Sequence, residues 1–317
     1  MAKKIMLSGV KPTGSPHIGN YFGAMKQFVE LSLSRDYECL VMIADYHALN
    51  FIQNAEEMRE NITAVLLDYM AIGLDPKKVT IFKQSDVSEH AELAWIFDTL
   101  TTMPYLMRAH AFKDAEAKNK EISVGTFNYP MLMAADILLY DADVVPVGAD
   151  QKQHVEIARD TAMKFNNAFG ETFKLPEPMI IQDVAIVPGT DGRKMSKSYG
   201  NTIPLFASQE EIKKAVMGIV TDSGTGIPEH VYAIHKLFRP AAELLPIYEA
   251  KAGKYKELKE MLIEDIEKFI APMRERRKKL EKNIPKALGL LKKGGARAKK
   301  IAEKKMKEVR EKIGVRV

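Results

Sequence analysis

Apolar and polar positions come in blocks along the first 190 residues, and the blocks have the lengths of strands and helices. Continuous apolar runs predict strands that are covered on both faces, at residues 5–7, 37–44, 79–83, 143–147 and 184–187. Stretches with helical spacing of apolar positions predict helices from residue 19, at 55–72 and 90–101, from residue 127, and at 152–165. This alternation is typical of an α/β fold with a doubly wound parallel sheet, which binds ligands at the carboxyl ends of its strands.

The strand pattern stops after residue 198, and the remaining sequence is helical. Helices are predicted at 208–220, 229–238, 240–251, 254–282 and 295–313, separated by turns that contain Gly, Pro or Asn. We therefore expect a Rossmann-like catalytic domain over residues 1–190 and an all-helical C-terminal domain within residues 191–317.

The composition is that of a globular protein, with 46% hydrophobic and 28% charged residues. No run approaches the about 20 apolar residues that cross a bilayer, and the first residues lack the pattern of a signal peptide. A single cysteine, Cys39, excludes an intramolecular disulfide and a four-cysteine zinc site. We expect a cytoplasmic protein without a membrane partner.

The charge is distributed unevenly along the chain. Residues 251–317 carry 23 Lys and Arg against 10 Asp and Glu, whereas residues 1–250 carry 24 against 32. A basic module on an acidic body predicts either a polyanion partner or a solvated lysine-rich face.

The first predicted strand runs into a loop with Gly9, Pro12, Gly14 and Pro16, and a helix follows at Gly19-Asn20. Such a strand–loop–helix places backbone amides and a helix N-terminus where a phosphate can bind. Gly19 lets a ligand approach the backbone closely. His17 is either part of that site or a helix cap.

A second candidate stretch is Arg193-Lys194-Met195-Ser196-Lys197-Ser198, which follows a glycine-rich turn. Its two lysines and two hydroxyls form a cationic loop suited to phosphate, or else a solvated surface loop. Together with Pro12-x-x-x-x-His17-Ile18-Gly19-Asn20, this stretch resembles the two signatures of class I aminoacyl-tRNA synthetases.

Asp136 is a lone acid in the apolar helix Pro130-x-Leu-Met-Ala-Ala-Asp-Ile-Leu-Leu-Tyr140. A buried carboxylate needs a hydrogen-bond donor, and an indole offers one N–H and no acceptor. Met133, one turn earlier, offers sulfur to an aromatic ring. The alternative is that Asp136 pairs with a neighbouring basic or tyrosyl group and that Met133 is core.

This helix, with Val145-Pro-Val-Gly-x-Asp-Gln-Lys-Gln-His154 after it, resembles the bacterial tryptophanyl-tRNA synthetase family from Ser8 to about Ser223. The resemblance implies ATP as substrate, Mg²⁺ with it, L-tryptophan and tRNA(Trp) as partners, and a homodimer. It makes residues 191–317 the signature loop and an anticodon-binding domain. It implies a tryptophan site made by Leu7, His47, Tyr129, Met133, Asp136 and Gln151. The implied ATP site comprises Lys11, Pro12, Thr13, His17, Gly19, Asn20, Gly148, Ala149, Asp150, Ile186, Lys194, Met195, Ser196, Lys197 and Ser198. Among these, His17, Lys194, Lys197 and Ser198 are the candidate catalytic residues, and no residue is assigned as a metal ligand.

Four positions depart from the family pattern. Leu7 stands where an aromatic residue is common, Lys11 where many relatives have Gln, and Ala149 where they often have Glu. The family has a lysine that binds pyrophosphate at the position of Ala115, so Lys113 or Lys118 is the candidate replacement for it.

The resemblance implies catalysis without an enzyme nucleophile: the tryptophan carboxylate attacks the α-phosphorus of ATP, and a tRNA ribose hydroxyl then attacks the adenylate. Three other functions remain open from the sequence. A tyrosyl-tRNA synthetase would carry a different pocket partner, and a small nucleotidyltransferase would not need the basic helical half. An RNA-binding protein on a former synthetase scaffold would lack the exchange reaction.

Overall fold

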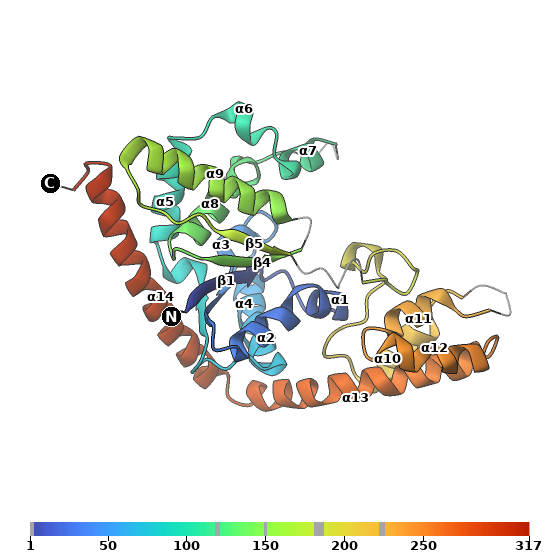
Figure 1. The fold of residues 1–317 in the computed structure, drawn as a ribbon. Coiled ribbons are helices and arrows are strands. Elements are labelled where there is room, and N and C mark those ends of the chain that lie inside the picture. The colour runs from blue at the N-terminus through green and yellow to red at the C-terminus, as the bar shows by residue number, and fades with distance from the viewer. Residues whose placement is uncertain (1–2, 118–120, 149–150, 181–186, 222–225, 317) are drawn as a thin grey trace.

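The structure is a computed structural model that describes residues 3–117, 121–148, 151–180, 187–221 and 226–316. Within these residues, five parallel strands form one sheet in the order β3-β2-β1-β4-β5 (Figure 1). The strands are β1 (Lys4–Val10), β2 (Tyr37–Ile43), β3 (Thr80–Lys83), β4 (Val144–Val147) and β5 (Glu177–Ile180). The chain winds outward from β1 in one direction and then in the other, which confirms the expected doubly wound sheet.

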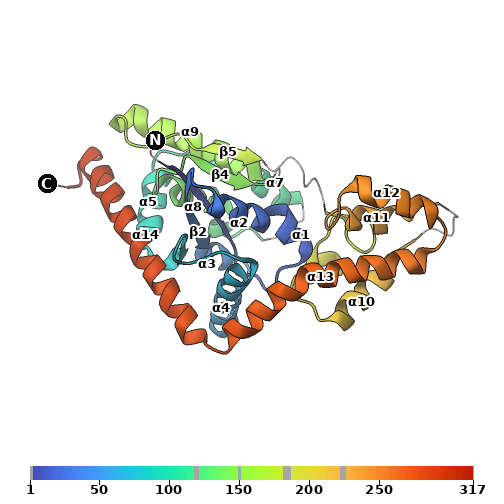
Figure 2. The same cartoon turned by 60° about the horizontal axis from the view of Figure 1, so that its bottom comes forward.

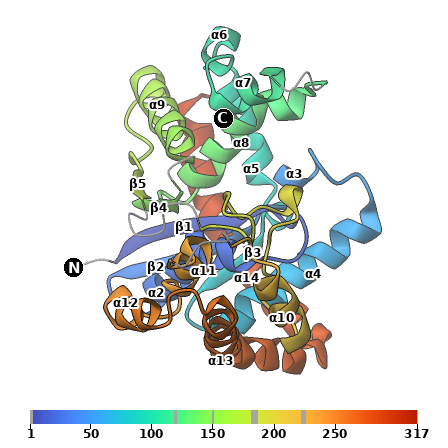
Figure 3. The ribbon, with the colours of Figure 1, turned by 90° about the vertical axis from the view of Figure 1, so that its right-hand side faces the viewer.

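The middle of β1 and most of β2 are buried on both faces because alternate side chains enter two apolar cores. Met6 and Val41 face one core, whereas Leu7 and Leu40 face the other. Helices α2 (Lys26–Leu33) and α4 (Ala55–Ile72) cover the first face. Helices α5 (Glu89–Asp98), α8 (Val124–Leu138) and α9 (Lys152–Phe169) cover the second, as the end-on view shows (Figure 3).

Short elements follow the strands where the site is built. They are α1 (Ile18–Asn20) with a π-helical turn (Tyr21–Met25), α3 (Asp45–Ala48), a 3₁₀ turn (Gln84–Asp86), α6 (Met103–Leu106), α7 (His110–Ala117) and a 3₁₀ turn (Lys197–Tyr199). The C-terminal part is helical, as expected: α10 (Gln209–Met217), α11 (Glu229–His235), α12 (Ala241–Ala250), α13 (Tyr255–Glu281) and α14 (Ile284–Lys312). In the described part of the chain, none of these helices combines the length and apolar character of a membrane span.

The sheet differs from the sequence prediction at its last strand. β5 lies at Glu177–Ile180, where no strand was expected, since the segment is short, only partly buried and contains Pro178. Proline is tolerated there because β5 is an edge strand. The strand expected at 184–187 lies almost wholly outside the described residues.

Helix α14 begins eleven residues before the predicted start at 295. The prediction left residues 283–294 outside a helix, but the helix starts after Asn283, whose side chain accepts a hydrogen bond from the Lys286 amide. Gly294 and Gly295 lie against the edge of the sheet, where a Cβ at Gly294 would stand 1.7 Å from the Ile81 carbonyl oxygen. Glycine therefore permits a close helix–strand contact here, and α14 returns along the catalytic sheet (Figure 2).

We expect Gly294→Ala to lower the free energy of unfolding by about 1–3 kcal/mol, because α14 must move away from β3 to admit the methyl group. The matched control is Gly289→Ala in the same helix, where an added Cβ would meet no atom within 4 Å. The free energy of unfolding of the control should rise by about 0.5–1 kcal/mol, because alanine has a better helix propensity than glycine. Urea unfolding measures both, and equal shifts in the two variants would contradict this account of the close contact.

Candidate active site

The first loop leads from the end of β1 at Val10 into α1. His17 caps that helix: its Nδ1 accepts a hydrogen bond from the Asn20 amide at 3.3 Å, and Asn20 Oδ1 accepts one from the His17 amide at 3.0 Å. Burial of the ring, with a contribution from the charge of Lys197, lowers the pKa of His17 to about 4. The imidazole is therefore neutral at pH 7, as its capping role requires.

The second loop is a tight turn held by one buried side chain. The Met195 amide donates to the Val187 carbonyl at 2.9 Å, and the Gly189 amide donates to the Arg193 carbonyl at 2.7 Å. Asn201, buried beneath the turn, accepts from the Ser196 amide at 2.8 Å and donates to the Lys194 carbonyl at 3.1 Å. The sequence analysis missed Asn201, since one Asn in a polar turn carries no pattern.

The structure brings the two loops together at the carboxyl end of β1. Lys197 Nζ donates to the Thr13 carbonyl oxygen at 3.0 Å across 184 positions of sequence. Gly14 adopts a φ of +91°, and a Cβ there would lie 3.4 Å from Lys197 Nζ. A Cβ at Gly19 would stand 3.3 Å from that of Met195. The predicted phosphate residues thus share one site.

The segment after the second loop completes this junction. The Ile18 amide donates to the Ile203 carbonyl at 2.9 Å, and the Leu205 amide donates to the Pro16 carbonyl at 3.0 Å. Residues 203–205 therefore lie beside the first loop and link it to the second.

The remaining predicted ATP residues lie around these loops. Lys11 Nζ stands 4.7 Å from the centre of the Phe51 ring, and the Gly148 carbonyl accepts a hydrogen bond from the Gln151 amide at the start of α9. Lys113 is exposed on α7. The predicted residues Ala149, Asp150 and Ile186, and the candidate replacement Lys118, lie outside the described residues.

Asp136 is buried in the middle of α8 and gathers donors from three other elements. Gln84 Nε2 donates to its Oδ1 at 2.7 Å, and His47 Nε2 lies 2.8 Å from its Oδ2. His90 Nδ1 lies 2.6 Å from Oδ1, and the Nε2 of the same ring pairs with the Tyr140 hydroxyl at 2.9 Å. Asp136 therefore pairs with two histidines and one amide, in line with the alternative of a neighbouring basic group.

These partners keep the carboxylate ionised. Burial by itself raises the pKa of Asp136, but the interactions with His47 and His90 outweigh it and lower the pKa to about 2. The Asp136 carboxylate is therefore ionised at neutral pH.

Sheet topology explains why these residues meet. His47 follows β2 and Gln84 follows β3, and neighbouring parallel strands end at the same edge of the sheet. Gln84 Oε1 also accepts from the Tyr46 amide at 3.1 Å, which ties the two strand ends together. The sequence analysis missed Gln84 and His90, although the position of Gln84 at a strand end was a usable signal.

Apolar and aromatic side chains lie near this carboxylate. Leu7 is buried on β1, and Met133 is partly buried one turn before Asp136 on α8. The Tyr129 hydroxyl pairs with His154 Nε2 at 2.6 Å, and the Tyr129 ring meets that of His47 edge-on at 6.0 Å. The His47 ring thus lies between Tyr129 and the Asp136 carboxylate, and Leu7 and Met133 belong to the same apolar core.

Comparison with known proteins identifies the family. The model for class I tRNA synthetases of the W and Y type matches residues 2–289. Tryptophan–tRNA ligases from Fusobacterium nucleatum and Rhodopirellula baltica are 48% and 44% identical, over 98% of this chain and 98% and 99% of theirs. The chain belongs to the tryptophan–tRNA ligase family.

Solved structures agree with this assignment. The tryptophanyl-tRNA synthetase of Campylobacter jejuni complexed with ADP and tryptophan has a TM-score of 0.89, at 44% identity, over 98% of this chain and 99% of that one. The tyrosyl-tRNA synthetase of Archaeoglobus fulgidus has a TM-score of 0.69 at 21% identity, which reflects the shared fold alone. The tyrosyl alternative therefore has no support beyond the fold.

The described residues of this tryptophan–tRNA ligase family member contain no group of three or more His, Cys, Asp or Glu placed to hold a metal ion. The phosphate region instead offers the cations of Lys194 and Lys197 and the neutral His17. This donor set does not fit a resident Mg²⁺ site built by the chain itself.

Proposed function

We propose that this protein activates L-tryptophan with ATP and transfers the tryptophanyl group to tRNA(Trp) for protein synthesis. The observation that carries the proposal is the buried Asp136 carboxylate, whose partners His47 and Gln84 follow β2 and β3 at the edge of the sheet where β1 runs into the first phosphate loop. Its two oxygens offer about four lone-pair directions, of which Gln84, His90 and His47 occupy three. One acceptor direction is left for an indole N–H.

The tryptophan site consists of an apolar wall and a polar end. Leu7 and Met133 contact the indole, and Asp136 accepts its N–H. His47, Tyr129 and Gln151 line the site around the amino acid. A tyrosine phenol, which has a donor at a different position and a smaller ring, fits this arrangement poorly.

The ATP site follows the two loops. Lys11, Pro12, Thr13, Gly19 and Asn20 hold the nucleotide on the first loop. Gly148, Ala149 and Asp150 border the ribose and Ile186 the adenine. The second loop, Lys194, Met195, Ser196, Lys197 and Ser198, closes on the phosphates. His17 acts by capping α1, so that the amides at its start keep their orientation.

The first reaction step needs positioning and charge stabilisation only. A carboxylate oxygen of tryptophan attacks the α-phosphorus in line, the bond from that phosphorus to the bridging oxygen breaks, and pyrophosphate leaves with the electron pair. Lys194, Lys197 and loop amides stabilise the charge that develops on the phosphoryl oxygens. In the second step a terminal tRNA hydroxyl attacks the adenylate carbonyl and AMP leaves.

The remaining assignments belong to the same proposal. Mg²⁺ accompanies the nucleotide, and residues 191–317 form the loop and the anticodon-binding domain on a catalytic domain of residues 1–190. The protein is cytoplasmic and forms a homodimer.

ATP–pyrophosphate exchange with each of the twenty amino acids tests the proposal. We expect exchange with tryptophan alone. Exchange with tyrosine would keep the reaction and overturn the Asp136 argument. Folded protein that gives no exchange with any amino acid would overturn the enzymatic function.

A further inference from the structure

The end of helix α13 is joined to α4 of the catalytic domain by a buried ion pair. Arg277 Nε donates to Asp68 Oδ1 at 2.6 Å, between residues 209 positions apart in the sequence. The Asp68 side chain is 2% exposed and that of Arg277 is 21% exposed. Next to it, Arg276 Nε donates to the Ala71 carbonyl at the end of α4 at 2.7 Å. The side chains of two consecutive arginines on α13 thus form hydrogen bonds with α4.

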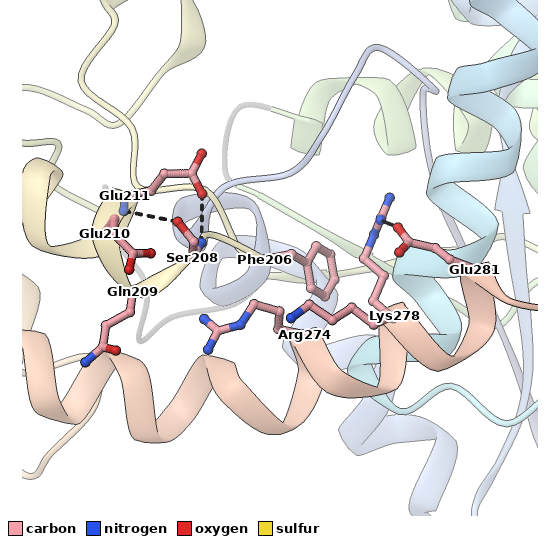
Figure 4. Close-up of a pocket in the computed structure, with 9 residues that line it drawn as sticks. Phe206, Ser208, Gln209, Glu210, Glu211, Arg274, Lys278 and Glu281 are labelled. Carbon is pink, nitrogen blue, oxygen red and sulfur yellow. Dashed lines mark hydrogen bonds and ion pairs between the residues drawn. The ribbon is translucent and has the colours of Figure 1, made fainter.

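The same turn of α13 also holds the segment that follows the second loop. The Arg277 guanidinium lies 5.4 Å from the centre of the Phe206 ring, and Arg274 Nη1 donates to the Ala207 carbonyl at 2.6 Å. Phe206 and Arg274 both line an open groove of about 440 Å³ between the start of α10 and the side of α13 (Figure 4). Arg277 therefore contacts both the catalytic domain and this segment.

The contacts continue from Phe206 to the phosphate loops. The neighbouring residues Ile203 and Leu205 exchange backbone hydrogen bonds with Pro16 and Ile18 of the first loop, and Lys197 of the second loop reaches the Thr13 carbonyl. A change in how Arg277 is held is therefore expected to displace a segment that is hydrogen-bonded to the first loop and follows the second loop in the sequence.

Asp68 also acts on the second loop through its charge. Burial lowers the pKa of Lys197 and the charge of Asp68 opposes this shift, and Lys197 in turn is among the groups that oppose the rise in the pKa of Asp68. One oxygen of Asp68, Oδ2, is buried without a hydrogen-bond partner among the described residues.

We propose that Asp68 and Arg277 are positioning residues for the second loop: their ion pair holds segment 203–207 where Lys197 meets the first loop. This inference rests on the proposed function, because the loop's lysines are taken to act on ATP. Neither residue touches the substrates. Breaking the pair should therefore impair the use of ATP and leave tryptophan binding intact.

The test measures exchange kinetics and tryptophan binding by equilibrium dialysis for Asp68→Asn, Arg277→Gln and the double variant. We expect kcat/KM for ATP to fall about 10- to 100-fold in each, with the double variant no worse than either single one. The dissociation constant of tryptophan should stay within about two-fold. Arg277→Lys, which keeps the charge, should recover part of the loss.

The matched control is Arg310→Gln. Arg310 also joins a C-terminal helix to the catalytic domain, through Glu92 at 2.7 Å, but it contacts neither loop. Its ATP kinetics should be those of the unmodified protein. An equal loss in the control, or additive losses in the double variant, would mean that the pair contributes only general stability.

The pH dependence of ATP use gives a second measurement, made on the unmodified protein and on Asp68→Asn. Burial raises the pKa of Asp68 to about 6, with Arg277 and Lys197 opposing and Glu281 adding to the effect. Protonation below that pH weakens the pair, so kcat/KM for ATP should fall through pH 6, and Asp68→Asn should lack this step. An identical profile in both proteins would overturn the inference, whereas absent exchange in the unmodified protein would overturn the proposed function instead.

Discussion

The Asp136→Asn variant is expected to bind tryptophan about 10- to 150-fold more weakly, which corresponds to a loss of about 1.5–3 kcal/mol for a hydrogen bond to a charged group. The amide keeps the shape of the side chain but turns one acceptor oxygen into a donor. It also removes the charge that His47 and His90 hold ionised. The measurement is the tryptophan KM in pyrophosphate exchange, together with the dissociation constant by equilibrium dialysis.

Asparagine tests this role better than alanine does. Asp136→Ala would leave Gln84 and two histidines buried without their partner, so loss of stability would obscure loss of binding. A suitable control is Asp160→Asn on α9, where the carboxylate accepts a hydrogen bond from Tyr105 at 2.6 Å outside the site. The control should keep its tryptophan KM. If folded Asp136→Asn keeps its KM as well, the carboxylate does not recognise the indole.

The Lys197→Ala variant is expected to form the adenylate about 10²- to 10³-fold more slowly, the range found when one preorganised transition-state donor is removed. Its ATP dissociation constant should change only a few-fold, because the ammonium interacts most strongly with charge that develops during phosphoryl transfer. Single-turnover adenylate formation at saturating ATP and tryptophan measures the rate separately from binding.

The control is Lys213→Ala, which also removes a lysine from the C-terminal half of the chain. Lys213 is exposed on α10. The control variant should leave the adenylation rate unchanged. A Lys197→Ala variant that lost ATP affinity but kept its rate would make the second loop a binding clamp without a role in the transition state.

Local patterns decided much of this fold. α4 spans the predicted residues 55–72, because Asn54 accepts from the Glu56 and Glu57 amides at its start and Gly73 adopts a φ of +117° at its end. The apolar run at 37–44 became β2, a strand with a core on each face. Caps and apolar runs are local signals, so one sequence is enough to locate them.

Errors arose where a local signal competed with a distant contact. Gly294-Gly295 indicates a helix break in isolation, yet the contact with Ile81 on β3 makes glycine necessary within a continuous helix. Pro178 likewise argues against a strand until β5 is seen to lie at the edge of the sheet.

The sequence by itself determined the alternating fold, the two loop signatures and the unusual buried position of Asp136. Only the tertiary structure decided which residues surround that carboxylate, how Asn201 shapes the second loop, and that Asp68 meets Arg277. The physical reason is that strand and helix periodicity is set by near neighbours, whereas these contacts depend on strand order and on the return path of α13 and α14. Residues far apart in the sequence meet there, so no local sequence pattern indicates these contacts.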